Sequence, residues 1–280
     1  MRALLSKSTA PANLTHHINP YQKLRSEILF SLFYQTFDVI HADTPELRAQ
    51  AHRLRYQVFC IENQGYEDHT SHPNGQEADS YDDHATHSLL VYKPTKTAIG
   101  TVRTIFANPY ALDQSFPLQN LSSASALHNE SYVKSGCEIS RLCISRELRT
   151  KIKDDLSHKR HHLGLNDPSL MRIALAIAPI GLIRGCFEMA LSRNVLNCYG
   201  VMEPHHLNKL VKAGLLHKKL GENISYHGER TPFMMNILET FDNAVLHHRD
   251  IWNIVSYRGF NHNLAQIVSR KQQMKLIYQH

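Results

Sequence analysis

Paired cysteines and metal-binding signatures are missing from this sequence. Its five cysteines form an odd set without a CxxC pair, and no HExxH motif is present. A disulfide framework uses an even number of cysteines and a zinc ribbon uses close pairs, so both scaffolds are disfavoured. We expect a reducing compartment, the cytoplasm, and free thiols at Cys60, Cys137, Cys143, Cys186 and Cys198.

Long hydrophobic runs are also missing. Only three consecutive apolar residues follow the second position, fewer than a signal peptide requires. The most apolar stretch, residues 170–187, contains two arginines and a proline, whereas a membrane span needs about 18 apolar residues. We therefore expect a soluble cytoplasmic protein, with peripheral membrane contact left open.

What the chain has is enough apolar residues for a core and an excess of basic ones. Of its 280 residues, 42% are hydrophobic and 20% are charged, which excludes general disorder. Lysine and arginine number 31 against 25 acids, giving a net charge of +6 and favouring an acidic partner. The sequence contains no motif of the kind that binds in a groove of DNA or RNA, so we do not expect nucleic acid as that partner.

Histidine is abundant, with 20 residues, of which several form adjacent pairs. Neighbours in sequence point to different faces of a helix or strand, so such pairs rarely chelate one ion. We expect surface histidines and no metal site.

Periodicity predicts alternating strands and helices. Strands are predicted at residues 37–41, 85–92, 98–106, 137–144 and 195–202, with weaker ones at 223–227 and 233–238. Helices are predicted after the Thr44 cap, from about residue 168 to 193, and at 205–213, whereas 146–162 is a loop or an exposed helix. The fold class is therefore α/β, a mixed sheet flanked by helices. We expect an N-terminal extension at 1–34, one domain at 35–240 and a basic, partly helical extension at 241–280.

Four short motifs carry reactive side chains. In chain order they are R-Y-Q-V-F at 55–59, E-x-D-x-Y-D at 77–82, G-T-V-R at 100–103 and E-I-S-R at 138–141. Strict alternation in the last strand would place Glu138 and Ser140 on one face and Arg141 on the other. A glutamate within an apolar strand costs free energy unless it is paired, so Glu138 is either salt-bridged or functional.

The order of these motifs resembles the acyl-homoserine-lactone autoinducer synthases. It is more similar to the N-acyl amino acid synthases and to the PEP-CTERM/exosortase system-associated acyltransferases, whose later blocks resemble residues 201–204 and 226–232. The resemblance covers about residues 37–240. It implies a GNAT-like, mostly antiparallel sheet and transfer of an acyl group from acyl carrier protein to an amine, with acyl-phosphopantetheine as donor and no bound cofactor.

The resemblance also implies roles for individual residues. It implies Glu138 as the base, with Ser140 and Arg141 beside it as the other catalytic residues. Substrate-binding positions are implied at Arg55, Phe59, Asp79, Asp82 and Arg103. Two structural alternatives stay open: the arginines and acids could form an ion-pair network that locks a loop onto the sheet, and Phe59 could be core packing.

Two departures from the family pattern bear on the substrates. Only the first glycine of a Q/R-x-x-G-x-G/A phosphate loop is present, at Gly164, which favours a phosphopantetheine arm over a whole coenzyme A. The usual tryptophan after the first helix is absent, with Tyr66 the nearest aromatic residue, which favours a plain amino acid acceptor over a lactone-forming one. An acetyl- or acyl-coenzyme A enzyme and a non-catalytic acyl-sensing or nucleic-acid-binding module stay as alternatives.

The net charge divides unevenly along the chain. Residues 62–83 hold seven acids and no lysine or arginine, and since the whole chain carries +6, the rest carries +13. We expect this acidic loop to help admit the ammonium group of the acceptor. The acidic carrier protein is expected to dock on Arg149, Lys151, Lys153, Lys159 and Arg160.

Overall fold

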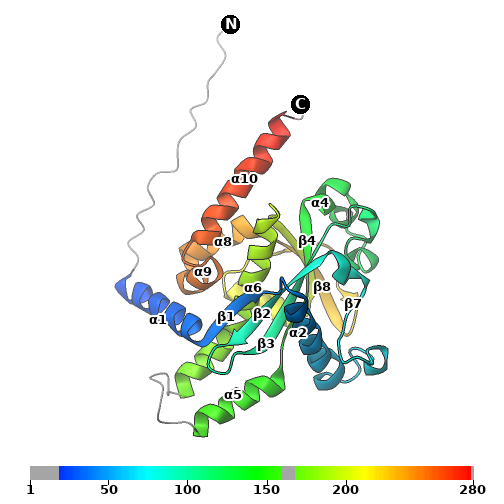
Figure 1. Cartoon of the computed structure of the whole chain (residues 1–280). Helices are drawn as coiled ribbons and strands as arrows, with labels where there is room; N and C mark the ends of the chain where they lie inside the picture. The colour runs from blue at the N-terminus through cyan, green and yellow to red at the C-terminus, as the bar shows by residue number, and fades with distance from the viewer. Residues whose placement is uncertain (1–18, 159–167, 279–280) are drawn as a thin grey trace.

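The computed structural model describes residues 19–158 and 168–278 and has a single open sheet with helices on both faces (Figure 1). The helices are α1 Pro20–Thr36, α2 Pro45–Tyr56, α3 Ser125–His128, α4 Glu130–Lys134, α5 Arg146–His158, α6 Pro168–Ser192, α7 Pro204–Lys212, α8 Ile237–His247, α9 Arg249–Val255 and α10 Phe260–Tyr278. The strands are β1 Phe37–His41, β2 Ala85–Tyr92, β3 Thr97–Phe106, β4 Gly136–Ile144, β5 Asn197–Met202, β6 Lys218–Lys219, β7 Ile224–Ser225 and β8 Glu229–Asn236. Short helical turns are η1 Gln57–Glu62, η2 His69–Ser71, η3 Ser80–His84, η4 Leu112–Gln114 and η5 Pro117–Asn120.

The sheet has the order β1-β2-β3-β4-β5-β8-β6, with β7 paired to β8. The β4–β5 pair is parallel, and the other described strand pairs are antiparallel. The predicted fold class, a mixed and mostly antiparallel sheet flanked by helices, is confirmed.

Local sequence signals explain most element boundaries. The Thr44 side chain accepts a hydrogen bond from the Leu47 N–H at 3.3 Å and caps α2, as predicted. The prediction of a strand at 233–238 is wrong at its end, because Asn236 accepts from the Glu239 N–H at 3.1 Å and so begins α8 at Ile237. Of residues 146–162, those up to 158 form α5, one of the two predicted alternatives, and the rest lie outside the described residues.

The main core lies between the sheet and α6. Leu182, Cys186 and Phe187 of α6 are fully buried against it, together with Phe33 of α1 and Phe241 of α8. By length and composition α6 could cross a membrane, but 61% of its apolar window is buried and it packs on β1, β2 and β3. In this fold α6 therefore serves as the central core helix.

The segments at the two ends of the described chain pack against each other. Asn253 of α9 donates to Ser26 of α1 at 2.5 Å, and Arg25 of α1 pairs with Asp250 of α9 at 2.9 Å. Both segments thus contribute to the same core as the sheet. The domain boundaries at residues 34 and 240 stay predictions.

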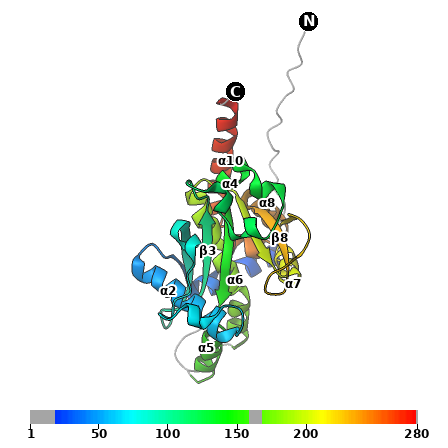
Figure 2. The same ribbon diagram turned by 90° about the vertical axis from the view of Figure 1, so that its right-hand side faces the viewer.

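The opposite face of the sheet carries α2, η1 and the segments at residues 63–84 and 107–135, which precede β2 and follow β3 (Figure 2). At its centre β4 and β5 pair only from Gly136 to Glu138, against Asn197 to Tyr199. A Cβ on Gly136 would collide with the Tyr199 ring, so glycine permits this close approach. Beyond Glu138 the two strands continue without pairing, which opens the middle of the sheet.

A bulge in β4 changes which side chains share a face. Arg103 of β3 lies opposite Ser140, whereas Thr101 lies opposite Cys143, so β4 has one extra residue between these pairs. Arg141 occupies this place with a φ of 52°. The predicted strict alternation is therefore wrong at Arg141, which joins Glu138 and Ser140 on the face that carries α2 and η1.

Candidate active site

Glu138 is a buried carboxyl group at the point where β4 and β5 separate. Its side chain is 2% exposed and one oxygen accepts the Leu118 N–H at 2.9 Å. Burial raises the pKa of Glu138 to about 7, outweighing the Leu118 hydrogen bond and the nearby arginines. A carboxyl group with this pKa can exchange a proton near neutral pH, which is what a general base requires.

Arg103 links Glu138's strand to the acidic loop. Its Nε donates to Ser140 Oγ at 2.9 Å, and its Nη1 donates to Asp79 at 2.6 Å and lies 3.1 Å from Asp82. The whole side chain is buried, yet its Nη2 has no hydrogen-bond partner among the described residues. This buried donor beside Ser140 is suited to binding an anionic group of a substrate.

Arg55 and Arg141 hold the remaining acids of the cluster. Arg55 donates to Glu77 at 2.5 Å and to both oxygens of Asp82 at 2.7 and 3.1 Å. Arg141 donates to Glu77 at 3.0 Å and to Glu67 at 2.9 Å. Burial alone would raise the pKa of Glu77, but the hydrogen bonds and charge of Arg55 and Arg141 outweigh it and lower the pKa to about 2. The predicted ion-pair network is therefore present, and Arg103, Arg141 and Asp79 lie close enough for their charges to act on the candidate base.

This network includes four of the seven acids of the acidic loop. Of its seven acids, Glu67, Glu77, Asp79 and Asp82 pair with the three arginines, and Glu62 accepts from the Ser145 hydroxyl and the Arg146 N–H at the start of α5. The expected attraction of an ammonium group by the loop as a whole is thus reduced, because three arginines from outside the loop offset three of its seven negative charges. The alternative that Phe59 is a core-packing residue also has support, since it is 8% exposed and packs with Val58 and Cys143.

A row of aromatic side chains crosses above the opening in the sheet. The Arg141 guanidinium lies 5.5 Å from the Phe59 ring centre, Phe59 lies 5.1 Å from Tyr66, and Tyr66 stacks on His227 at 4.1 Å and 18°. Because Arg141 belongs to β4 and His227 to the β7–β8 turn, the row spans the place where β4 and β5 part. Sequence reasoning missed His227, although it lies in the block at 226–232.

Arg230 fixes the turn that carries His227. It donates to the backbone oxygens of Tyr226 and His227 at 3.1 and 2.9 Å and pairs with Glu203 at 2.7 Å. His227 has a φ of 48°, a left-handed conformation that such bonds help to hold. The two later sequence blocks, 201–204 and 226–232, are thus joined in space by one ion pair.

The expected docking residues lie apart from this cluster, on α5. Lys153 is exposed, Lys151 pairs with Glu147 at 2.5 Å, and Arg149 is half-buried and donates to the Leu175 carbonyl at 3.5 Å. Lys159 and Arg160 lie outside the described residues. Of the described set, Lys151 and Lys153 are therefore the ones placed to meet a partner.

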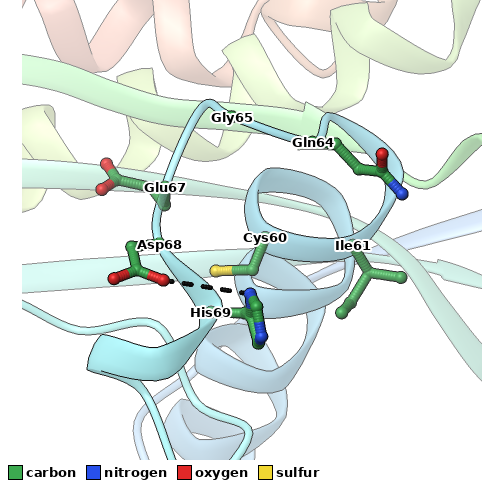
Figure 3. Close-up of a pocket in the computed structure, with 7 residues that line it drawn as sticks. All are labelled: Cys60, Ile61, Gln64, Gly65, Glu67, Asp68 and His69. Atoms are coloured by element: carbon green, nitrogen blue, oxygen red, sulfur yellow. Dashed lines mark ion pairs between the residues drawn. The ribbon is translucent and has the colours of Figure 1, made fainter.

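Two cavities lie beside the cluster. One, of about 560 Å³, is lined by Cys60, Glu67 and His69 among others (Figure 3). The other, of about 710 Å³, contains Tyr81, whose hydroxyl accepts from Asn120 at 3.0 Å. Asn120 belongs to η5, the turn whose Leu118 contacts Glu138, so this second cavity lies one layer of side chains from the base.

The thiols near the cluster are poor candidates for nucleophiles. Burial raises the pKa of Cys60 to about 11 and that of Cys143 to about 12. Both are therefore protonated at neutral pH, whereas a cysteine nucleophile needs its thiolate form.

One buried group has the residue types of a metal site. The Nε2 atoms of His52 and His87 lie 3.9 and 3.3 Å from Asp82 Oδ1. That oxygen already accepts from Arg55 and lies 3.1 Å from Arg103, so a metal ion would face two guanidinium groups. Burial lowers the pKa of His87 to about 3, which keeps the ring neutral beside these cations.

Residues 54–157 match a family model described as an acetyltransferase (GNAT) domain. No curated protein matches the sequence. Similar solved structures include the acyl-homoserine-lactone synthase LasI, at 19% identity and a TM-score of 0.46 over 72% of this chain and 90% of that one. The N-acyl amino acid synthase FeeM from uncultured soil microbes matches at 14% identity and a TM-score of 0.49 over 75% and 96%.

A third similar structure is the coenzyme A-dependent acyl-homoserine-lactone synthase BjaI with SAM and isopentyl-CoA, at 20% identity and a TM-score of 0.48 over 80% of this chain and 88% of that one. The family match is the stronger finding, because it covers η1, the acidic loop and β4. Residues 54–157 are therefore similar to a GNAT acetyltransferase domain, and this segment holds Arg55, the acidic loop, Arg103 and Glu138.

Proposed function

We propose that the protein is a cytoplasmic N-acyltransferase that moves a long-chain fatty acyl group from the phosphopantetheine thioester of acyl carrier protein to the amine of an amino acid. The observation that carries this proposal is the place of Glu138, a buried carboxyl group with a pKa of about 7 where β4 and β5 separate. The order of the four motifs and the GNAT domain match support it. The association with an exosortase system stays a prediction.

The chemistry follows from the proton that the acceptor must lose. An ammonium group cannot attack a thioester, and Glu138 can take its proton directly or through one water. The amine nitrogen then bonds to the carbonyl carbon, the carbon–sulfur bond breaks, and the pantetheine thiol leaves with a proton. Beyond Glu138, the β4 edge that has no β5 partner can direct backbone N–H groups at the developing oxyanion.

Arg103 supports an amino acid as the acceptor. Its Nη2 is buried without a described partner and lies on the guanidinium that binds Ser140 and Asp79. An acceptor carboxylate would provide the missing hydrogen-bond acceptor and hold the amine near Glu138. Burying such a donor without a partner costs about 1–3 kcal/mol, so a ligand that pairs with it gains affinity.

The donor is the less constrained half of the proposal. The exposed Lys151 and Lys153 on α5 support an acidic carrier protein, and acyl-coenzyme A is the alternative. We expect the double variant Lys151→Glu and Lys153→Glu to weaken acyl carrier protein binding by about tenfold, because each reversal replaces attraction with repulsion. Fluorescence anisotropy with labelled carrier protein measures this.

The matched control for this variant is Lys209→Glu with Lys212→Glu, which reverses two exposed charges on α7. It should leave affinity for the carrier protein within about twofold. Equal affinities of both double variants and the unmodified protein would contradict docking on α5.

The aromatic row gives a second expectation. Replacing His227 with alanine removes its stack on Tyr66 and should raise KM for a long-chain acyl donor about fivefold while changing kcat little, since such a contact contributes about 1 kcal/mol. His247→Ala, at an exposed position of α8, is the control. A fall in kcat with KM unchanged would place His227 in the chemical step instead.

The direct test of the proposed function combines donors and acceptors. The purified protein is incubated with acyl carrier protein thioesters of several chain lengths and a pool of amino acids, and mass spectrometry detects amides while a thiol reagent measures released pantetheine. We expect an N-acyl amino acid. Turnover with acyl-coenzyme A alone would correct the donor, and thioester binding with no product would indicate a non-catalytic acyl-binding module and overturn the proposal.

A further inference from the structure

Helix α10 leaves the body of the fold. In both views its C-terminal half extends beyond the sheet and the other helices (Figures 1 and 2). Ala265 and Val268, near its start, are fully buried and attach it to the core. Residues 270, 271 and 273–275 are exposed. The helix is thus anchored at one end and presents the other to solvent.

The side of α10 away from the core carries four large apolar side chains. Phe260 is 66% exposed, Ile267 47%, Met274 51% and Ile277 70%. At about 100° per residue, spacings of seven, seven and three place these four side chains within about 100° of the helix circumference, opposite Ala265, and the exposed Asn263 and Arg270 share this arc. We call the four apolar residues the outer stripe. Exposed apolar residues scattered singly are ordinary, but four on one side of a projecting helix favour an interaction surface.

The charges on α10 are all of one sign. Arg270, Lys271 and Lys275 are its charged residues, and residues 260–278 contain no aspartate or glutamate. None of the three forms an ion pair with another described residue. On the helix, Arg270 lies within the arc of the outer stripe, and Lys271 lies at its edge. A second copy of α10 would bring like charges together, whereas a negatively charged surface would compensate them.

We propose that the outer stripe and these three basic residues bind the surface of an anionic lipid bilayer. The helix would lie in the plane of the headgroups, with the apolar side chains at the boundary of the acyl chains. The long stems of arginine and lysine let their charged ends reach the lipid phosphates. This inference stands on α10 alone and does not depend on the proposed acyl transfer, although an acylated product would also partition into such a surface.

The test is co-sedimentation of the full chain with lipid vesicles. One set is phosphatidylcholine alone and the other contains about 30% phosphatidylglycerol, a fraction that gives a clearly negative surface. We expect the partition coefficient to be at least about tenfold higher for the anionic vesicles and to fall as salt is added. The double variant Met274→Asp with Ile277→Asp should lower binding by at least about tenfold, because it removes apolar surface from the contact.

Two controls complete the experiment. Val211→Asp, at a position of α7 that is 44% exposed, should bind as the unmodified protein does. Lys271→Glu with Lys275→Glu should remove the preference for anionic vesicles. Equal binding to both vesicle types, or full binding by the Met274→Asp, Ile277→Asp variant, would overturn the proposal. A dimer in vesicle-free solution that this variant abolishes would assign the outer stripe to a second copy instead.

Discussion

Replacing Glu138 with glutamine is expected to lower kcat by about 100-fold to 10,000-fold, the range for loss of a positioned general base. Glutamine keeps the size of the side chain and can still accept the Leu118 N–H, which Glu138 accepts at 2.9 Å. It cannot accept the proton of the acceptor amine. Steady-state kinetics with an acyl thioester and an amino acid measures the change.

Stability separates this catalytic effect from a folding defect. The pKa of Glu138 is raised to about 7 in the folded protein, so its ionised form costs stability once the pH rises above the unfolded value of 4.5. Glutamine is neutral, and the variant should therefore be at least as stable as the unmodified protein at about pH 8. Glu130→Gln, at an exposed position of α4, is the control for both measurements. A variant at Glu138 that keeps kcat within about tenfold would show that another group is the base.

Replacing Arg55 with methionine is expected to destabilise the fold by about 3–5 kcal/mol, because it removes one of the two guanidinium groups that face each of two buried carboxylates. Arg55 is 0% exposed, and it contacts Glu77 at 2.5 Å and Asp82 at 2.7 Å. These contacts tie α2 to the acidic loop and do not reach Glu138. The main effect should be on the free energy of unfolding, measured by urea denaturation.

Arg53→Met is the matched control, since it changes an exposed arginine of the same helix. Its effect should stay within about 0.5 kcal/mol. Combining Arg55→Met with Glu77→Gln should recover part of the loss, because the second change removes one of the two negative charges that Arg55 had faced. A loss of less than about 1 kcal/mol for Arg55→Met would show that water or rearrangement compensates the two acids.

The sequence signals that succeeded were local ones. The strands at 37–41 and 85–92 have the predicted bounds, and the predicted cap at Thr44 depends on a hydrogen bond between neighbouring residues. The four motifs also meet in space: Arg55, Asp82, Arg103 and Arg141 lie in one cluster next to Glu138. Charged residues within otherwise apolar strands were the sequence signal that indicated this cluster.

The features that sequence reasoning missed depend on distant partners. The bulge at Arg141 arises from the register against Thr101 and Arg103, which a period-two pattern does not contain. The stack of Tyr66 on His227 joins residues far apart in the chain. The charge of the acidic loop also depends on distant arginines, since a count of acids along the sequence does not include the partners that compensate them.

The pH dependence of kcat/KM tests the role of Glu138 most directly. The unmodified protein and the Glu138→Gln variant are assayed with the same acyl thioester and the same amino acid, so that titration of the acceptor amine contributes equally to both profiles. We expect the ratio of the two rates to rise with pH and to level off above a pKa of about 7, the pKa of Glu138 in the folded protein. A ratio that does not change with pH would contradict proton transfer to Glu138.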